Sequence, residues 1–299
     1  MELRALTEQD LTALLDLCQQ TLTFDHVTRS ILERRALRQP LHEPRHQLGV
    51  WDGGRLVGAL LSGIREVESE RVAWIRLLAV DPAYRRRGVA SGMLAELEPL
   101  LRSRGIRRLL VGGSAPNYFW PGIDVRYTAG VCFLLAHGFH RSGEAVDMLV
   151  DLSRRDWDTA AEEARLAREG YTIRRLLPED REAFAAWMAA HWSPVWRAEA
   201  LESYENRPAS TFVAVRDGQF CAFASYNVTM FENSFGPTGT LPEHRGRGLG
   251  RVLFYRCMQD LKAQGHETAD ICWVGPIAFY ARVADAWIHR VFWFMEKEL

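Results

Sequence analysis

The chain has 299 residues, of which 47% are hydrophobic and 25% charged, proportions typical of a globular protein that is long enough for two domains. Its formal net charge of −1 argues against nucleic acid as a partner, and no apolar run is long enough to span a membrane. The N-terminus lacks a signal-peptide pattern and the 5 cysteines are scattered without a C-x-x-C pair, so we expect a cytoplasmic protein with reduced thiols and no metal ligation.

The first predicted elements of the chain recur in its second half. The segment 3–10 (LRALTEQD) leads into an apolar helical pattern, and the segment 173–180 (IRRLLPED) does the same. The segments 50–57 and 215–222 each read as a strand, an Asp-Gly turn and a second strand, which is typical of a β-hairpin. These two recurrences suggest that the chain contains an internal repeat.

A third pair of segments carries the most specific pattern. The apolar strand 72–80 ends at a proline and is followed by a loop with the spacing Arg85-x-x-Gly88-x-Ala90, here the first phosphate loop (85–90). The second phosphate loop (245–250) has the spacing Arg-x-x-Gly-x-Gly, and an amphipathic helix ending at glycine follows each loop. A glycine-rich turn before a helix N-terminus favours anion binding, because the first amide groups of the helix lack helical partners.

The three recurrences keep their order, which indicates an ancient duplication. The spacing between matching positions falls from 170 residues (Arg4 to Arg174) to 160 (Arg85 to Arg245), as changes in loop length would produce. We expect a first domain over 1–155, a linker helix over 156–171 and a second domain over 172–299.

The segments LAVDPAYRRRGVASGML and GTLPEHRGRGLGRVLFY both resemble the acetyl-CoA-binding motif of the GCN5-related N-acetyltransferase (GNAT) superfamily. The resemblance covers both halves of the chain. It implies an α+β fold in three αβα layers around a mixed, mostly antiparallel sheet, with two tandem GNAT-like domains. It also implies that acetyl-CoA is the cofactor, with its pyrophosphate on the loop amides and its pantetheine arm between two strands that splay apart. The expected cofactor contacts are Leu78, Ala79, Val80, Arg85, Arg86, Arg87, Gly88, Val89, Ala90 and Ser91 in the first repeat, and Thr240, Leu241, Arg245, Gly246, Arg247, Gly248, Leu249, Gly250 and Arg251 in the second.

Amide formation from a thioester needs a neutral amine and a proton donor for the departing thiolate. In the family this donor is commonly a tyrosine near the last helix, and Tyr280 in the second repeat resembles it. The first repeat has Leu134 at the matching place, and leucine cannot donate a proton; Tyr118 and Tyr127 are nearby candidates. The second repeat lacks the Gly-Phe ending of the family (138–139 in the first) and has Ala284-Asp285 instead.

Carboxylates near the strand before the phosphate loop are candidates for the general base. The second repeat offers Glu232, with Asp270 as a second choice, and the first offers Glu66, Glu68 and Glu70, whose alternate spacing would place them on one face of a strand. A water relay would leave no sequence pattern.

Aromatic residues near the expected site suggest a substrate wall. They lie in the segment 117–124, with three aromatics in a Pro-Gly loop, and at Trp187, Trp192 and Trp196; packing in the core explains them equally well. We expect an acetyl-CoA-dependent N-acetyltransferase that acts on a primary amine of a small molecule, an amino sugar among the candidates, with its chemistry in the second domain. The alternatives are a non-catalytic acyl-CoA-binding sensor or partner-binding protein, and a protein N-acetyltransferase. We expect no nucleic-acid or membrane partner, and a monomer or homodimer.

Overall fold

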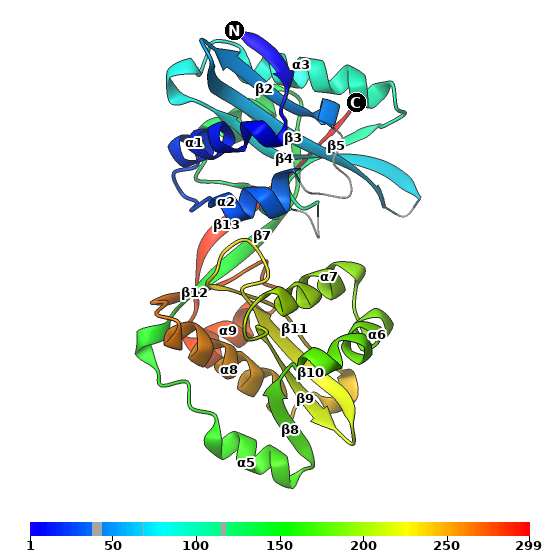
Figure 1. The fold of residues 1–299 in the computed structure, drawn as a ribbon, viewed down its shortest axis with the longest axis vertical. Helices are drawn as coiled ribbons and strands as arrows, with labels where there is room; N and C mark the ends of the chain where they lie inside the picture. The colour runs from blue at the N-terminus through cyan, green and yellow to red at the C-terminus, as the bar shows by residue number, and fades with distance from the viewer. Residues whose placement is uncertain (38–43, 68, 115–117) are drawn as a thin grey trace. The chain divides into compact units, whose positions relative to one another are not determined.

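The computed structural model describes residues 1–37, 44–67, 69–114 and 118–299. The chain forms two compact units (Figure 1): unit 1 comprises Met1–Ala145 with Val291–Leu299, and unit 2 comprises Val146–Arg290. This division differs from the expected domains 1–155 and 172–299, because two long strands, β7 (His140–Asp151) and β13 (Trp287–Glu298), each begin in one unit and end in the other.

Unit 1 is built on antiparallel strands to which one parallel strand is added. Strands β1 (Glu2–Ala5), β2 (Gln47–Asp52), β3 (Arg55–Val67) and β4 (Glu70–Val80) are antiparallel neighbours, and β5 (Arg108–Val111) runs parallel to β4. The helices are α1 (Leu11–Thr21), α2 (Arg29–Leu32), α3 (Val89–Arg102) and α4 (Thr128–Ala136). Shorter elements are 3-10 turns at Glu8–Asp10, Pro44–His46 and Pro82–Tyr84, a π-helical turn at Glu33–Leu37 and the two-residue strand β6 (Ile123–Asp124).

Helices cover both faces of the unit 1 sheet. Ala73 and Ile75 of β4 pack in one core with the apolar side of α3, whereas Trp74 between them is also buried and therefore faces the opposite side. Helix α1 packs against β3 and β4. The amphipathic pattern predicted after the first phosphate loop thus becomes α3, whose residues Val89, Met93 and Leu97 are buried.

Unit 2 repeats this plan. Strands β8 (Tyr171–Arg175), β9 (Thr211–Arg216), β10 (Gln219–Tyr226) and β11 (Ser234–Thr240) are antiparallel neighbours, and β12 (Thr268–Ile271) is parallel to β11. The helices are α5 (Ala160–Arg168), α6 (Arg181–His191), α7 (Pro194–Glu202), α8 (Leu249–Ala263) and α9 (Ile277–Ala284). The 3-10 turns are Leu152–Arg154, Pro178–Asp180, Ser203–Glu205 and Pro242–His244.

The strands of unit 2 run between α8 and α9 on one side and α6 and α7 on the other (Figure 1). Alternate residues of β9 show the two faces: Phe212 and Ala214 belong to the core under α8, and Val213 to the core under α6 and α7. Both repeats therefore have the mixed, mostly antiparallel α+β architecture that the resemblance implied.

Matching contacts confirm the duplication. The guanidinium of Arg4 donates two hydrogen bonds to Asp10 (2.9 and 2.7 Å), and Arg174 makes the same pair with Asp180 (2.6 and 2.9 Å). Each pair ties the first strand of a repeat to the turn that starts its first helix.

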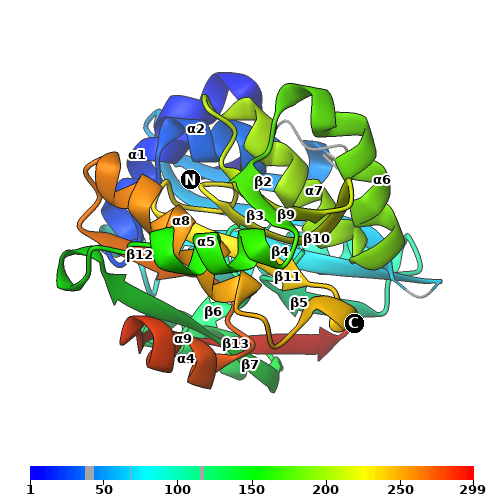
Figure 2. The ribbon, with the colours of Figure 1, turned by 90° about the horizontal axis from the view of Figure 1, so that it is seen from below.

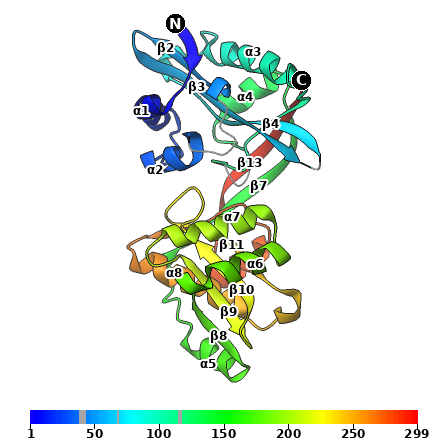
Figure 3. The same ribbon diagram turned by 45° about the vertical axis from the view of Figure 1, so that its right-hand side comes forward.

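Each unit also receives a strand that begins in the other. Strand β13 begins in unit 2 and pairs with β5 of unit 1, and β7 begins in unit 1 and pairs with β12 of unit 2. The two long strands run alongside each other (Figure 3). We did not predict this exchange, because in the sequence each strand reads as the ordinary end of its own repeat.

The segment 156–171, expected as a linker helix, contains α5 and the first residue of β8 and lies within unit 2. Glu163 pairs with Arg256 (2.6 Å) and Glu162 with Arg251 (2.7 Å), so that α5 is fastened to α8 (Figure 2). Among the described residues, we find no helix whose length and apolar character would suit a bilayer.

Candidate active site

The two phosphate loops share one backbone conformation. Two left-handed residues occur in each, Arg86 and Gly88 (φ 61° and 79°) in the first loop and Gly246 and Gly248 (φ 78° and 87°) in the second. The second residue of each pair is the N-cap of the following helix, α3 or α8. A left-handed residue at this place turns the chain sharply into the helix, and glycine adopts that conformation without steric cost.

The first arginine of each loop serves its own strand. Arg85 Nε donates to the carbonyl of Val80 (3.3 Å), and Arg245 Nε donates to that of Thr240 (3.1 Å). These residues therefore fasten the loop to the strand end, and the amides at the start of α3 and α8 remain as the groups able to receive an anion.

The surroundings of the two loops differ. A Cβ added at Gly88 would meet nothing within 4 Å, so the first loop is open at that point. A Cβ added at Gly248 would lie 3.4 Å from Arg165 Nη2 of α5, and this nitrogen donates to the carbonyl of Arg247 (2.7 Å). The second loop is thus flanked by a charged helix.

In both repeats two parallel strands stop pairing partway, as expected for strands that splay apart. The last paired residues of β4 and β5 are Ile75 and Val111, and the amide of Gly112 still reaches the Ile75 carbonyl (2.9 Å). In the second repeat Phe235 pairs with Ile271, and the amide of Cys272 reaches the Phe235 carbonyl (3.3 Å). Beyond these points β4 and β11 continue to the phosphate loops without further pairing to β5 or β12 in the described residues.

The expected cofactor residues follow these strand ends and loops. Leu78, Ala79 and Val80 end β4, Thr240 ends β11, and Leu241 begins the turn after it. Besides Arg85 and Arg245, further side chains in the set are engaged: Ser91 Oγ lies 3.0 Å from His137 Nε2, and Arg251 pairs with Glu162.

Tyr280 lies on α9 beside the point where β11 and β12 part. Its ring contacts those of Phe235 (6.0 Å between centroids) and Phe254 (5.5 Å), and only 4% of the residue is exposed. Burial raises the pKa of Tyr280, so its hydroxyl keeps its proton at neutral pH. A protonated hydroxyl at this position suits a general acid.

Leu134 is the residue that we expect at the matching place in the first repeat. Its carbonyl accepts the amide of Phe139, five residues later (3.1 Å), and the carbonyl of Tyr280 accepts that of Ala286, six residues later (3.4 Å). The residue before each of these amides, Gly138 in the first repeat (φ 84°) and Asp285 in the second (φ 51°), has a left-handed backbone. An aspartate therefore makes the helix-ending turn that the Gly-Phe ending makes in the first repeat, and the last strand follows in the normal way.

Tyr127, a candidate donor in the first repeat, is engaged elsewhere. Its hydroxyl donates to Asp25 (2.6 Å), and Trp120 Nε1 of the aromatic segment donates to the same carboxylate (2.8 Å), so these two residues tie α4 and the loop before it to the chain after α1. Phe119 is buried, and Asn117 lies outside the described residues.

The candidate bases lie in different surroundings. Glu232 is exposed in the turn before β11. Glu66 and Glu70 are exposed on β3 and β4 at the two sides of a hairpin turn, so they do not share one strand as expected, and Glu68 lies outside the described residues. By contrast, Asp270 is buried on β12, opposite Ser234 of β11.

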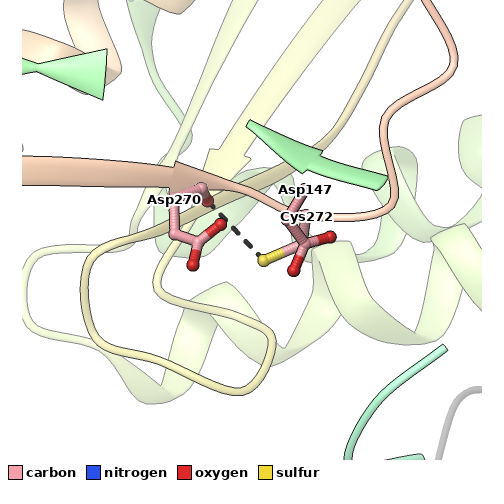
Figure 4. Close-up of side chains that lie close together, drawn as sticks. All are labelled: Asp147, Asp270 and Cys272. Carbon is pink, nitrogen blue, oxygen red and sulfur yellow. Dashed lines mark hydrogen bonds between the residues drawn. The ribbon is translucent and has the colours of Figure 1, made fainter. Parts of the chain in front are cut away.

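Asp270 belongs to a cluster that the sequence did not reveal. Figure 4 shows Asp270 with Asp147 of β7 and Cys272, whose donor atoms all lie within 4.8 Å of one another. His289 Nε2 of β13 is 3.2 Å from Asp270 Oδ1, and the amide of Trp273 donates to Asp147 (2.7 Å). Burial and then the two carboxylates raise the pKa of Cys272, so its thiol stays protonated. We assign no metal to this group.

The tryptophans of the second repeat divide into packing and surface residues. Trp192 fills the space over Gly239 of β11, where an added Cβ would lie 2.3 Å from its ring. Trp187 packs against Phe223 (5.9 Å), whereas Trp196 stacks on Trp192 (5.4 Å) and is 37% exposed. Trp196 is therefore the residue of this group that offers a ring face to a ligand.

Comparison with known proteins agrees with the duplicated architecture. A structure described as a GCN5-related glucosamine N-acetyltransferase region in a fungal multi-domain β-N-acetylglucosaminidase has a TM-score of 0.79 with this chain at 19% identity. The match covers 99% of this chain and 38% of that one. A tandem GNAT protein from the clavulanic acid biosynthesis pathway matches 99% of this chain and 98% of its own, with a TM-score of 0.70 at 19% identity. A GCN5-related N-acetyltransferase from Sphaerobacter thermophilus has a TM-score of 0.69 with this chain at 15% identity, and the match covers 99% of this chain and 95% of that protein.

No curated relative matches the sequence. At these low identities the solved structures show the fold alone. The family model described as "Acetyltransferase (GNAT) family" matches residues 11–118 and again 173–284, which together are most of the chain and include both phosphate loops. The chain therefore belongs to the GNAT acetyltransferase family and carries two copies of its domain.

Proposed function

We propose that the chain transfers the acetyl group of acetyl-CoA to a primary amine of a small molecule, and that the second repeat carries out this reaction. The observation that carries the proposal is the position of Tyr280. It is a buried, protonated donor beside Phe235, where β11 leaves β12, and β11 leads from there directly to a glycine-rich anion loop.

Each part of unit 2 has a chemical task in this proposal. The amides at the start of α8 receive the pyrophosphate, and the unpaired end of β11 lies along the pantetheine arm. Acetyl-CoA supplies the thioester when it is bound. Tyr280 gives its proton to the departing thiolate, which makes thiolate expulsion easier. A water-poor setting around Tyr280 strengthens that hydrogen bond.

The first repeat is better suited to cofactor binding or support than to the same chemistry. Its phosphate loop is open and its strands part in the same register, but Leu134 stands where a proton donor is needed. A non-catalytic acyl-CoA-binding copy within one chain fits this combination.

An amino sugar is the acceptor that we favour. The exposed ring of Trp196 can stack on a sugar face, and the solved structure with TM-score 0.79 contains a glucosamine N-acetyltransferase region. Amino sugars, aminoglycosides, polyamines and amino acids form the panel that separates the acceptor classes.

The test is release of CoA thiol from acetyl-CoA in the presence of each amine. We expect Tyr280→Phe to lower kcat by about 10²-fold or more while acetyl-CoA binding stays near normal, because the ring and its packing remain. Tyr127→Phe in the first repeat is the matched control and should keep most of its turnover. Full turnover in the Tyr280→Phe protein would rule out Tyr280 as the proton donor. If the wild-type protein binds acetyl-CoA but turns over no amine, the result would favour the alternative of a non-catalytic acyl-CoA-binding sensor.

A further inference from the structure

The strand separation in unit 2 has different chemistry on its two faces. Phe235 of β11 and Ile271 of β12 point into the core under α8, on the side where Tyr280 lies. Side chains alternate along a strand, so Ser234 and Asp270, one residue earlier, point to the opposite face. The sheet therefore places a proton donor for the thiolate on one face, and a buried carboxylate on the other.

That carboxylate holds an imidazole. Asp270 Oδ1 lies 3.2 Å from His289 Nε2, and 5% of Asp270 is exposed. No hydrogen bond occupies the other ring nitrogen, Nδ1, within the described residues, and the side chain is 21% exposed. A carboxylate that accepts from one ring nitrogen fixes the ring and its tautomer, and leaves the other nitrogen as a proton acceptor.

The neighbouring charges suit this task. The carboxylates of Asp270 on β12 and Asp147 on β7 lie near each other, and Arg290 follows His289 on β13 and is buried. The thiol of Cys272 completes the set and stays protonated. A second carboxylate and an arginine beside the pair keep the surroundings polar without adding a large net charge.

We propose that His289, oriented by Asp270, is the group that takes the proton from the acceptor amine in the second repeat. The inference rests on the proposed function, since it needs the thioester at the strand separation. The ammonium of the acceptor gives a proton to Nδ1 of neutral His289, and the imidazolium formed is stabilised by Asp270. The freed amine nitrogen forms the amide bond as the bond from carbonyl carbon to sulfur breaks, and Tyr280 protonates the thiolate. The second proton, which the nitrogen loses as the amide forms, replaces through solvent the proton that Tyr280 gave. His289 then returns its own proton to water, so that one proton is released in each turnover.

The experiment measures kcat and kcat/KM from pH 5 to 9.5 for the wild-type protein, His289→Gln, Asp270→Asn and Glu232→Gln, with the best amine of the panel. His266→Gln is the matched control, because His266 lies in the turn before β12, at the other end of that strand. Binding of acetyl-CoA and the melting temperature are measured for every variant, so that a folding defect is recognised.

We expect His289→Gln to lower kcat by about 10²- to 10⁴-fold at pH 7 and to recover part of it at high pH, where the amine loses its proton unaided. Asp270→Asn should lower kcat with little change in the KM for the amine, because the ring would no longer be held for proton transfer. A packing defect would also lower acetyl-CoA binding or the melting temperature, so a loss confined to kcat identifies Asp270 as a positioning residue.

Two outcomes would overturn the assignment. One is a His289→Gln protein that keeps the turnover and pH profile of the wild type. If Tyr280→Phe is impaired in the same assay, the proposed function stays intact and only the role of His289 is removed. The other is a loss confined to Glu232→Gln, which would make the exposed turn the source of the base. A wild-type protein inactive on every amine would remove both the proposed function and this inference.

Discussion

At the scale of single residues, one aspartate in each repeat ties the turn before the first helix to the first strand. The hydrogen bonds from Arg4 lower the pKa of Asp10 to about 2, and those from Arg174 lower the pKa of Asp180. A carboxyl whose folded pKa is depressed stabilises the protein above its unfolded pKa of about 3.9, and this contribution is lost as the pH falls toward the folded value.

We therefore expect Asp10→Asn to have a lower free energy of unfolding than the wild type at pH 6. The difference between the two proteins should narrow between about pH 4 and pH 2. Urea unfolding at a series of pH values measures this difference. Asp16→Asn, on the exposed side of α1, is the control and should follow the wild type. A gap that stays constant down to pH 2 would show that the Arg4–Asp10 pair does not set the acid dependence.

At the scale of elements, α5 and the residue just beyond it pair with arginines near the second phosphate loop. Glu162 pairs with Arg251 (2.7 Å), and Glu169, just beyond the helix, lies 3.8 Å from Arg247. A phosphate bound at this loop would compete with these two carboxylates for the arginines. Exposed ion pairs of this kind contribute up to ~1 kcal/mol each.

We expect the double change Glu162→Gln with Glu169→Gln to tighten CoA binding at the second loop by roughly two- to tenfold. Glu163→Gln is the matched control, because Glu163 comes from the same helix but pairs with Arg256, farther along α8. Calorimetry is done in a Gly88→Leu background, in which the left-handed position of the first loop is strained. Unchanged or weaker binding in the double variant would exclude the competition.

The elements also show which features sequence reasoning could reach. Both phosphate loops were predictable because a left-handed N-cap requires glycine, and Gly88 and Gly248 stand at that place. Asp285 is also left-handed, but it ends a helix and is not a glycine, so its role was hidden. The pairing of Asp270 with His289 joins β12 to β13, and no spacing in the chain signals a contact that depends on strand order.

At the scale of the whole molecule, the two repeats complete each other through exchanged strands. The segment Val291–Leu299 belongs to unit 1, where Phe292 and Met295 of β13 are fully buried. Met295 pairs with Val111 of β5, and Lys297 contacts Glu98 of α3 (2.5 Å). The first repeat, cut out as 1–155, would lack this strand and expose the edge of β5.

This exchange predicts that damage at the C-terminus weakens the unit that contains the N-terminus. Met295→Ala removes a buried side chain and should cost about 2–5 kcal/mol, seen as faster amide exchange in the strands of unit 1. Met258→Ala, equally buried but on α8, is the matched control and should speed exchange in unit 2 instead. Deletion of 291–299 should expose the core of unit 1 to a hydrophobic dye, and the peptide added in trans should reverse this. If Met295→Ala sped exchange only in unit 2, the strands would not be exchanged in solution, because the side chain would then support the repeat from which it comes.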